Sequence, residues 1–133
     1  MKSPQNTLIL HIEDNPENRL LVRRLLISGG YKLAEAENVQ QAQDFMAGQL
    51  PDLILMDINL PGVDGYTLTS YFKTILGLSR LPIIAITANV MKGDRDRAIK
   101  AGCDGYIEKP IDVDTFLDQV AAFLSDATNS SEA

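Results

Sequence analysis

Three nearly unbroken apolar runs constrain the fold of this chain more than any other feature of its sequence. Each run is directly followed by a polar residue, and they read TLILHI (residues 7–12), DLILM (residues 52–56) and PIIAI (residues 82–86). Each has the length of one strand but lacks the polar alternation of a strand with one face in water. Such runs are typical of a parallel sheet that helices cover on both faces. We therefore expect a buried parallel sheet.

More polar segments separate these runs. Pro16 suits the first turn of a helix, and Gly29 with Gly30 would end that helix. Helices are predicted over residues 16–28, 39–47, 66–78, 93–101 and 113–124, and two further strands over residues 31–36 and 106–108. This alternation of strands and helices predicts an α/β fold.

The polarity of the strands predicts their order in the sheet. Lys32 and Glu35 make the second strand suitable for an edge, and Glu108 does the same for the fifth. The order 2-1-3-4-5 puts both at edges and is one of the two common doubly wound arrangements. We predict a flavodoxin-like doubly wound (βα)5 domain with a five-stranded parallel sheet over residues 1–125. A disordered polar tail is expected over residues 126–133.

Composition narrows the classes of function. The formal net charge of −6 argues against direct binding to nucleic acid, which needs a basic face. No apolar run approaches the roughly 18–20 residues of a membrane span, and the first residues do not resemble a signal peptide. The single cysteine, Cys103, cannot form an internal disulfide. We expect a cytoplasmic protein that binds neither nucleic acid nor membrane.

Polar side chains gather where the predicted strands end. Glu13 and Asp14 follow the first strand, while Asp57, Thr87 and Lys109 follow the third, fourth and fifth. The carboxyl ends of parallel strands share one edge of the sheet, where ligands bind. Three neighbouring carboxylates repel each other unless a cation intervenes. Because the expected ligands are oxygens, Mg²⁺ fits best, with Mn²⁺ as an alternative.

The same residues suit phosphoryl transfer. The carboxylate of Asp57 is expected to act as a nucleophile toward phosphorus. Lys109 and the metal would neutralise the charge on the phosphoryl oxygens, and Thr87 could donate a hydrogen bond to one of them.

In these segments the sequence resembles the receiver domains of response regulators from two-component and phosphorelay systems. The resemblance covers about residues 7–125 and rests on EDNPEN, DINLPGVDG, ITANVMKGD and GCDGYIEKP taken together. It implies that a histidine kinase or a histidine phosphotransfer protein phosphorylates Asp57. It also implies that Glu13 or Asp14, Asp57 and the backbone carbonyl of Asn59 bind Mg²⁺.

The resemblance further implies a switch. Thr87 would move toward the phosphoryl group while Tyr106 rotates inward, and Asn59 and Asn89 would tune the lifetime of the phosphorylated state. The fourth helix, fifth strand and last helix would then bind a downstream protein. The chain is expected to be a monomer or weak dimer. It would be no enzyme, apart from catalysing its own phosphorylation and dephosphorylation.

Other interpretations stay open to different degrees. A haloacid-dehalogenase-type phosphatase would need a second Asp where Asn59 stands. A flavodoxin-like cofactor binder would need a phosphate loop rich in Ser, Thr and Gly where residues 13–16 stand. A stand-alone receiver is preferred to a fragment of a hybrid kinase or multidomain regulator, and a module that works without phosphorylation is also considered. His11 is expected to be partly buried and hydrogen-bonded rather than a metal ligand.

Overall fold

Five strands form one parallel sheet in the order β2-β1-β3-β4-β5, as predicted. The structure, a computed structural model, describes residues 3–88 and 94–132. The strands are β1 (Leu8–Ile12), β2 (Lys32–Ala36), β3 (Leu53–Asp57), β4 (Ile83–Thr87) and β5 (Gly105–Glu108). All four strand pairs are parallel, so their carboxyl ends meet at one edge of the sheet.

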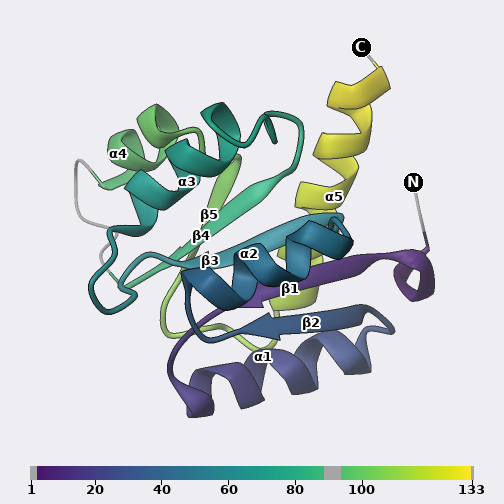
Figure 1. The fold of residues 1–133 in the computed structure, drawn as a ribbon. Helices are drawn as coiled ribbons and strands as arrows, with labels where there is room; N and C mark the ends of the chain where they lie inside the picture. Colours follow the sequence, from purple (N-terminus) through teal and green to yellow (C-terminus); the bar gives the residue numbers. More distant parts are fainter. Residues whose placement is uncertain (1–2, 89–93, 133) are drawn as a thin grey trace.

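Helices cover both faces of this sheet. They are α1 (Pro16–Ser28), α2 (Val39–Gly48), α3 (Gly65–Thr74), α4 (Asp94–Ala101) and α5 (Phe116–Glu132), and the short 3-10 helix η1 (Pro4–Asn6) precedes β1. Figure 1 shows α1 on the side of the sheet opposite to α3 and α4. Helices α1 and α5 share one apolar cluster, and α2, α3 and α4 share the other.

The strands supply both clusters through alternate side chains. Leu10 and Met56 point toward α2, α3 and α4, whereas Ile9 and Leu55 point toward α1 and α5. Every residue of β3 and β4 is buried, which explains why their sequences are apolar without alternation. Each large apolar side chain removed from water contributes about 1.5–3 kcal/mol, so the burial of these two strands stabilises the core.

Helix ends differ from the prediction by more than two residues in α3 and α5. Helix α3 ends at Thr74, and the chain turns at Gly77, whose φ of 70° suits glycine. Helix α5 starts at Phe116, after a turn in which Asp112 accepts backbone hydrogen bonds, and it continues to Glu132. The helix end predicted at residue 124 is therefore wrong, because no Gly or Pro follows to stop the helix. The boundary at residue 125 between the folded domain and a C-terminal tail stays a prediction.

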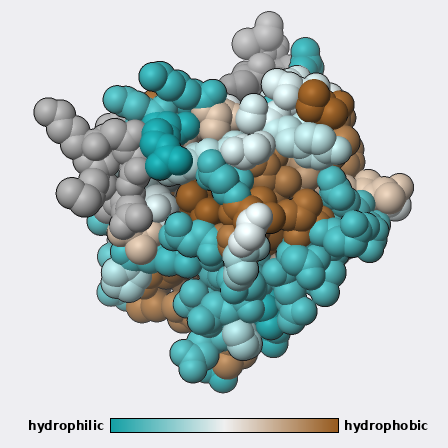
Figure 2. Space-filling view, turned by 60° about the vertical axis from the view of Figure 1, so that its left-hand side comes forward, coloured by the Kyte–Doolittle hydropathy of each residue, from teal (hydrophilic) through white to brown (hydrophobic). Residues whose placement is uncertain are grey.

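An apolar groove lies between α2 and the segment after α3. It has a volume of about 300 Å³, and its walls include Met46, Leu50, Leu76 and Leu78. Figure 2 shows hydrophobic residues gathered in the middle of one face, with hydrophilic residues around them. The groove adjoins the carboxyl ends of α2 and α3, so it lies away from the carboxyl ends of the strands. Among the described residues, every helix is too short or too polar to span a membrane.

Candidate functional site

Three carboxylates meet at the carboxyl ends of β1 and β3. Oxygen atoms of Glu13, Asp14 and Asp57 lie within 4.8 Å of one another. Glu13 and Asp57 are buried, with exposed fractions of 1% and 3%, while Asp14 is exposed. The structure thus brings together the three acidic residues for which the sequence predicted a shared metal site.

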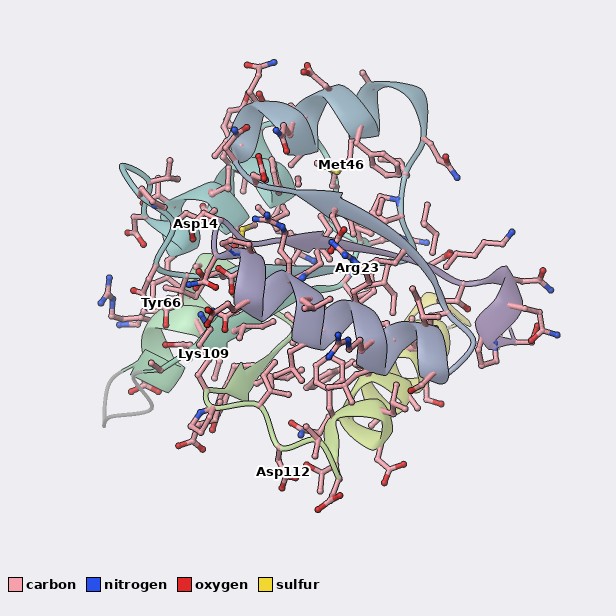
Figure 3. The ribbon with its side chains drawn as sticks, turned by 90° about the horizontal axis from the view of Figure 1, so that it is seen from below. Asp14, Arg23, Met46, Tyr66, Lys109 and Asp112 are labelled. Carbon is pink, nitrogen blue, oxygen red and sulfur yellow. The ribbon has the colours of Figure 1, made fainter. Side chains whose placement is uncertain are left out.

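Lys109 connects two of these carboxylates. Its Nζ lies 3.3 Å from Oδ1 of Asp57 and 3.4 Å from Oε1 of Glu13. Lys109 directly follows β5, and its backbone N–H donates to the carbonyl of Thr87, which holds it beside the end of β4. Figure 3 shows Asp14 and Lys109 together at one end of the sheet. A single ammonium faces two buried carboxylates, so the cluster retains a negative charge that a cation would offset.

Burial and neighbouring charge alter the protonation of Glu13. Removal from water, and next the nearby Asp57, raise the pKa of its carboxyl, which is about 7 in the folded chain. Lys109 and the backbone N–H of Asn15 act in the opposite direction. All ligand atoms of this cluster are oxygens, which fits a hard divalent cation such as Mg²⁺.

The loop between β1 and α1 is fixed by two residues that sequence reasoning missed as site residues. Asn15 caps α1 by accepting hydrogen bonds from the N–H groups of Glu17 and Asn18. Arg19 donates from Nη1 to the carbonyls of Glu13 and Asp14, at 2.9 Å each. The capping signal of Asn15 is visible in the sequence. The sequence does not show the contact of Arg19 with these carbonyls, because an arginine in the first turn of a helix is ordinarily solvent-exposed.

Thr87 and Tyr106 lie on the same face of the sheet. The register of β4 and β5 pairs Ala85 with Tyr106, and Thr87 is two residues beyond Ala85. Thr87 is buried and Tyr106 is half-buried against the cluster that α3 and α4 cover. Asp57 pairs with Ile86 on β4, so Thr87 is one residue beyond the partner of the predicted phosphoacceptor.

Of the two residues predicted to tune the lifetime of the phosphorylated state, the structure describes Asn59 but not Asn89. Asn59 is exposed and follows Asp57 closely, and its backbone N–H donates to Oδ1 of Asp57 at 3.0 Å. That the backbone carbonyl of Asn59 binds the metal stays a prediction. Asn89 lies outside the described residues.

His11 does not match its prediction. It is completely buried, and neither ring nitrogen has a hydrogen-bond partner among the described residues. Burial lowers its pKa to about 4, so the ring is neutral at physiological pH. His11, Glu13 and Lys109 line a cavity of about 360 Å³ between α1 and the segment after β5. Sequence reasoning placed His11 inside a strand correctly, but it could not show that the described part of the chain offers the ring no hydrogen-bond partner.

Comparison with known proteins identifies the class of protein to which this fold and this site belong. Residues 9–121 match the family model described as "Response regulator receiver domain". The chain therefore belongs to the family of response regulator receiver domains.

Relatives with curated names support this assignment. The chain is 41% identical over 124 residues to the polar-differentiation response regulator DivK of Brucella anthropi, and the match covers 93% of this chain and 99% of that protein. It is 40% identical over 119 residues to the DivK of Brucella ovis, covering 90% of this chain and 97% of that protein.

Solved structures show the same fold. The receiver domain of a sensor histidine kinase from Pseudomonas aeruginosa PAO1 matches with a TM-score of 0.79 and 34% identity, covering 90% of this chain and 98% of that one. That structure has a magnesium ion coordinated in its active-site cleft. A putative response regulator from Chloroflexus aurantiacus matches with a TM-score of 0.83 and 26% identity, covering 90% and 98% of the two chains.

Proposed function

We propose that this receiver domain accepts a phosphoryl group on Asp57 from a phosphohistidine of a histidine kinase or histidine phosphotransfer protein. The observation that carries the proposal is the contact of Lys109 with both Asp57 and Glu13, beside the carboxylate of Asp14. A buried nucleophile, a cation and a potential metal site thus lie within one small cluster. The magnesium in the related kinase receiver domain supports Mg²⁺ as the metal here.

The chain's own residues have distinct parts in the transfer. A carboxylate oxygen of Asp57 forms the new bond to phosphorus, while the bond between phosphorus and the donor nitrogen breaks. Lys109 shifts its contact from the carboxylates to the phosphoryl oxygens and stabilises their charge. Glu13, Asp14 and Asp57 would hold Mg²⁺, which supplies further positive charge at these oxygens. The chain catalyses only its own phosphorylation and the later hydrolysis.

Phosphorylation is proposed to change the surface formed by α4, β5 and α5. Thr87 is at the end of β4, and Tyr106 lies on the same sheet face under α4, so a movement of Thr87 toward the phosphoryl group makes room for the tyrosine ring. A downstream protein in the cytoplasm would bind the altered surface, with the domain acting as a monomer or weak dimer.

The test is phosphorylation by a small phosphoryl donor in the presence of Mg²⁺. We expect intact-protein mass spectrometry to detect one added phosphoryl group on the original chain. The variant Asp57→Asn, which keeps the shape of the side chain but loses its nucleophilic charge, should gain none. Asp52→Asn serves as a matched control at the other end of β3 and should be labelled normally. Equal labelling of Asp57→Asn would contradict the proposal.

A further inference from the structure

The guanidinium of Arg19 on α1 binds the backbone of the two acidic residues that follow β1. Its Nη1 donates to the carbonyl oxygen of Glu13 and to that of Asp14, each at 2.9 Å. Both hydrogen atoms of this nitrogen are therefore engaged by two consecutive peptide groups. The side chain of Arg19 is only 13% exposed, so water competes little for these hydrogen bonds.

These two peptide groups lie on either side of the Cα atom of Asp14. The carbonyl of Glu13 belongs to the peptide before this atom, and the carbonyl of Asp14 belongs to the peptide after it. Because each peptide is planar, holding both planes also holds φ and ψ of Asp14, and with them the direction of its Cα–Cβ bond. Arg19 therefore sets the direction in which the side chain of Asp14 leaves the backbone.

Asp14 depends more on such support than the other two carboxylates of the cluster. Glu13 and Asp57 are buried and Lys109 contacts both, so packing and ion pairs hold them in place. Asp14 is exposed and lies on the loop between β1 and α1. A side chain that is free to move loses conformational entropy when it binds a cation, which weakens binding unless the backbone already orients it.

The guanidinium of Arg19 is also anchored to the turn between β2 and α2. Its Nη2 lies 3.0 Å from Oε1 of Glu37. Gln41 on α2 holds this glutamate in turn, because the N–H of Glu37 donates to Oε1 of Gln41 at 2.7 Å and Oε2 of Glu37 accepts from Nε2 of Gln41 at 3.4 Å. The contact with Glu37 offsets part of the positive charge of Arg19 and keeps its planar fork directed at the two carbonyls.

We propose that Arg19 is a positioning residue for Mg²⁺ binding, which presents the carboxylate of Asp14 to the cation, and that Glu37 holds Arg19 in place. This inference rests on the proposed function, which includes the metal site. The direction of the effect separates positioning from a simple effect of charge. A nearby cation repels Mg²⁺, so loss of the charge of Arg19 alone would strengthen Mg²⁺ binding. Loss of its two carbonyl contacts weakens Mg²⁺ binding, because Asp14 is then free to turn away from the site.

Arg23 provides a matched control one turn further along α1. It makes a comparable contact with β2, because its Nη2 lies 2.8 Å from Oε1 of Glu35 and its Nε donates to both oxygens of that carboxylate at 3.2 Å. Figure 3 shows Arg23 away from Asp14 and Lys109. Removing either arginine costs one positive charge and one ion pair of α1, but the contacts of Arg23 are with β2 rather than with the loop before α1.

The experiment titrates the intact, metal-free chain with Mg²⁺ alone and follows the backbone amide shifts by NMR. We expect Arg19→Gln to raise the dissociation constant of Mg²⁺ about tenfold, as is typical when a residue that orients a metal ligand is lost. Arg19→Lys, which keeps the charge without the planar fork, should raise it about threefold. Glu37→Gln should also raise it about threefold, because the guanidinium loses its charged anchor. Arg23→Gln should change it by less than about twofold.

A second measurement distinguishes positioning from general damage to the fold. Phosphoramidate labels the chain at a series of Mg²⁺ concentrations, and the initial rate is followed by intact-protein mass spectrometry. Arg19→Gln should need about tenfold more Mg²⁺ to reach half of its maximal rate, while that maximal rate stays within about twofold of the original chain. A lower maximal rate with an unchanged requirement for Mg²⁺ would mean that Arg19 acts on the site as a whole and would overturn its assignment to metal binding.

The outcomes separate this inference from the proposed function. Unchanged or tighter Mg²⁺ binding by Arg19→Gln, or an equal loss in Arg23→Gln, overturns the role of Arg19 and leaves Asp57 as the proposed acceptor. If the Mg²⁺ titrations give the expected differences but Asp57 is not labelled, the proposed phosphoryl transfer fails while the role of Arg19 in metal binding stands. If Mg²⁺ does not bind the original chain, the metal site and this inference fail together.

Discussion

At the scale of single residues, Glu13 is a group whose buried position disfavours its charged form. It is buried beside Asp57, and its pKa of about 7 means that deprotonation in the folded chain is unfavourable compared with deprotonation in the unfolded chain. A bound cation would stabilise the deprotonated carboxylate of Glu13 and so lower its pKa. The site is therefore suited to binding metal because its metal-free form carries a repulsion between carboxylates that Lys109 relieves only in part.

This repulsion predicts a pH-dependent effect of Glu13→Gln. The folded chain binds more protons at Glu13 than the unfolded chain between its usual pKa of 4.5 and the raised value of about 7, so the free energy of unfolding falls as pH rises through this window. A glutamine at this position is neutral at every pH, so its variant does not lose stability in this way as pH rises. Metal-free Glu13→Gln should therefore be more stable than the original chain by about 1–3 kcal/mol at pH 8 and nearly equal to it at pH 4.5.

Urea denaturation with a chelator at the two pH values measures the difference. Glu17→Gln, an exposed neighbour in α1, serves as the control and should show little dependence on pH. A Glu13→Gln chain that is equally destabilised at both pH values would show that the carboxylate is not strained. The same variant should bind Mg²⁺ at least about tenfold more weakly, because it loses a charged ligand.

At the scale of the elements, the loop between β3 and α3 is held by close backbone packing. The N–H of Gly65 donates to the carbonyl of Ile58 at 3.2 Å. A Cβ at Gly65 would lie 2.6 Å from Cα of Ile58, a contact that only a backbone shift could relieve. Ile58 joins Asp57 to Asn59, so this packing positions the residues around the proposed phosphoacceptor.

We therefore expect Gly65→Ala to destabilise the domain and displace the site. The overpacking should lower the free energy of unfolding by about 1–3 kcal/mol and slow labelling of Asp57. Gly48→Ala is the matched control, because a Cβ there meets nothing within 4 Å at the end of α2. It should be neutral or more stable by up to about 1 kcal/mol. Denaturation curves of both variants measure this, and equal effects would contradict the account of the loop.

The elements also show what the sequence could predict. Unbroken apolar runs and the polar residues after them located three strands and the acidic cluster, because both signals are local in the chain. The contact of Arg97 with Tyr66 joins α4 to α3 and leaves no periodic signal. The lack of a hydrogen-bond partner for His11 among the described residues depends on tertiary packing. The extension of α5 to Glu132 depends on weak helix propensities.

At the scale of the whole molecule, the sheet connects the proposed phosphorylation site with the surface of α4 and β5. The end of β4 carries Thr87, and the adjacent strand carries Tyr106 on the same face. Helices α3 and α4 cover this face and pack together, so a change at Thr87 can alter the position of α4. The two sheet faces have separate apolar clusters, which allows one face to change while α1 stays in place.

Chemical-shift mapping with beryllofluoride and Mg²⁺, which together imitate the phosphoryl group, tests this connection. We expect shifts at the carboxyl ends of the strands and also in α4, β5 and the start of α5. The exposed surface of α2 serves as an internal reference and should change least. Thr87→Ala should keep the shifts near Asp57 and reduce those in β5. Shifts confined to the strand ends would contradict the proposed switch.

The central claim is that Asp57 is the phosphorylated residue, and the bond it forms can be located directly. Borohydride reduces an aspartyl phosphate to homoserine, which peptide mass spectrometry identifies at a single position. After treatment with phosphoramidate and Mg²⁺, we predict homoserine at position 57 alone, and none when Mg²⁺ is chelated. Homoserine at another carboxylate such as Asp14 or Asp64, or a phosphoryl group that borohydride does not reduce, would contradict the account.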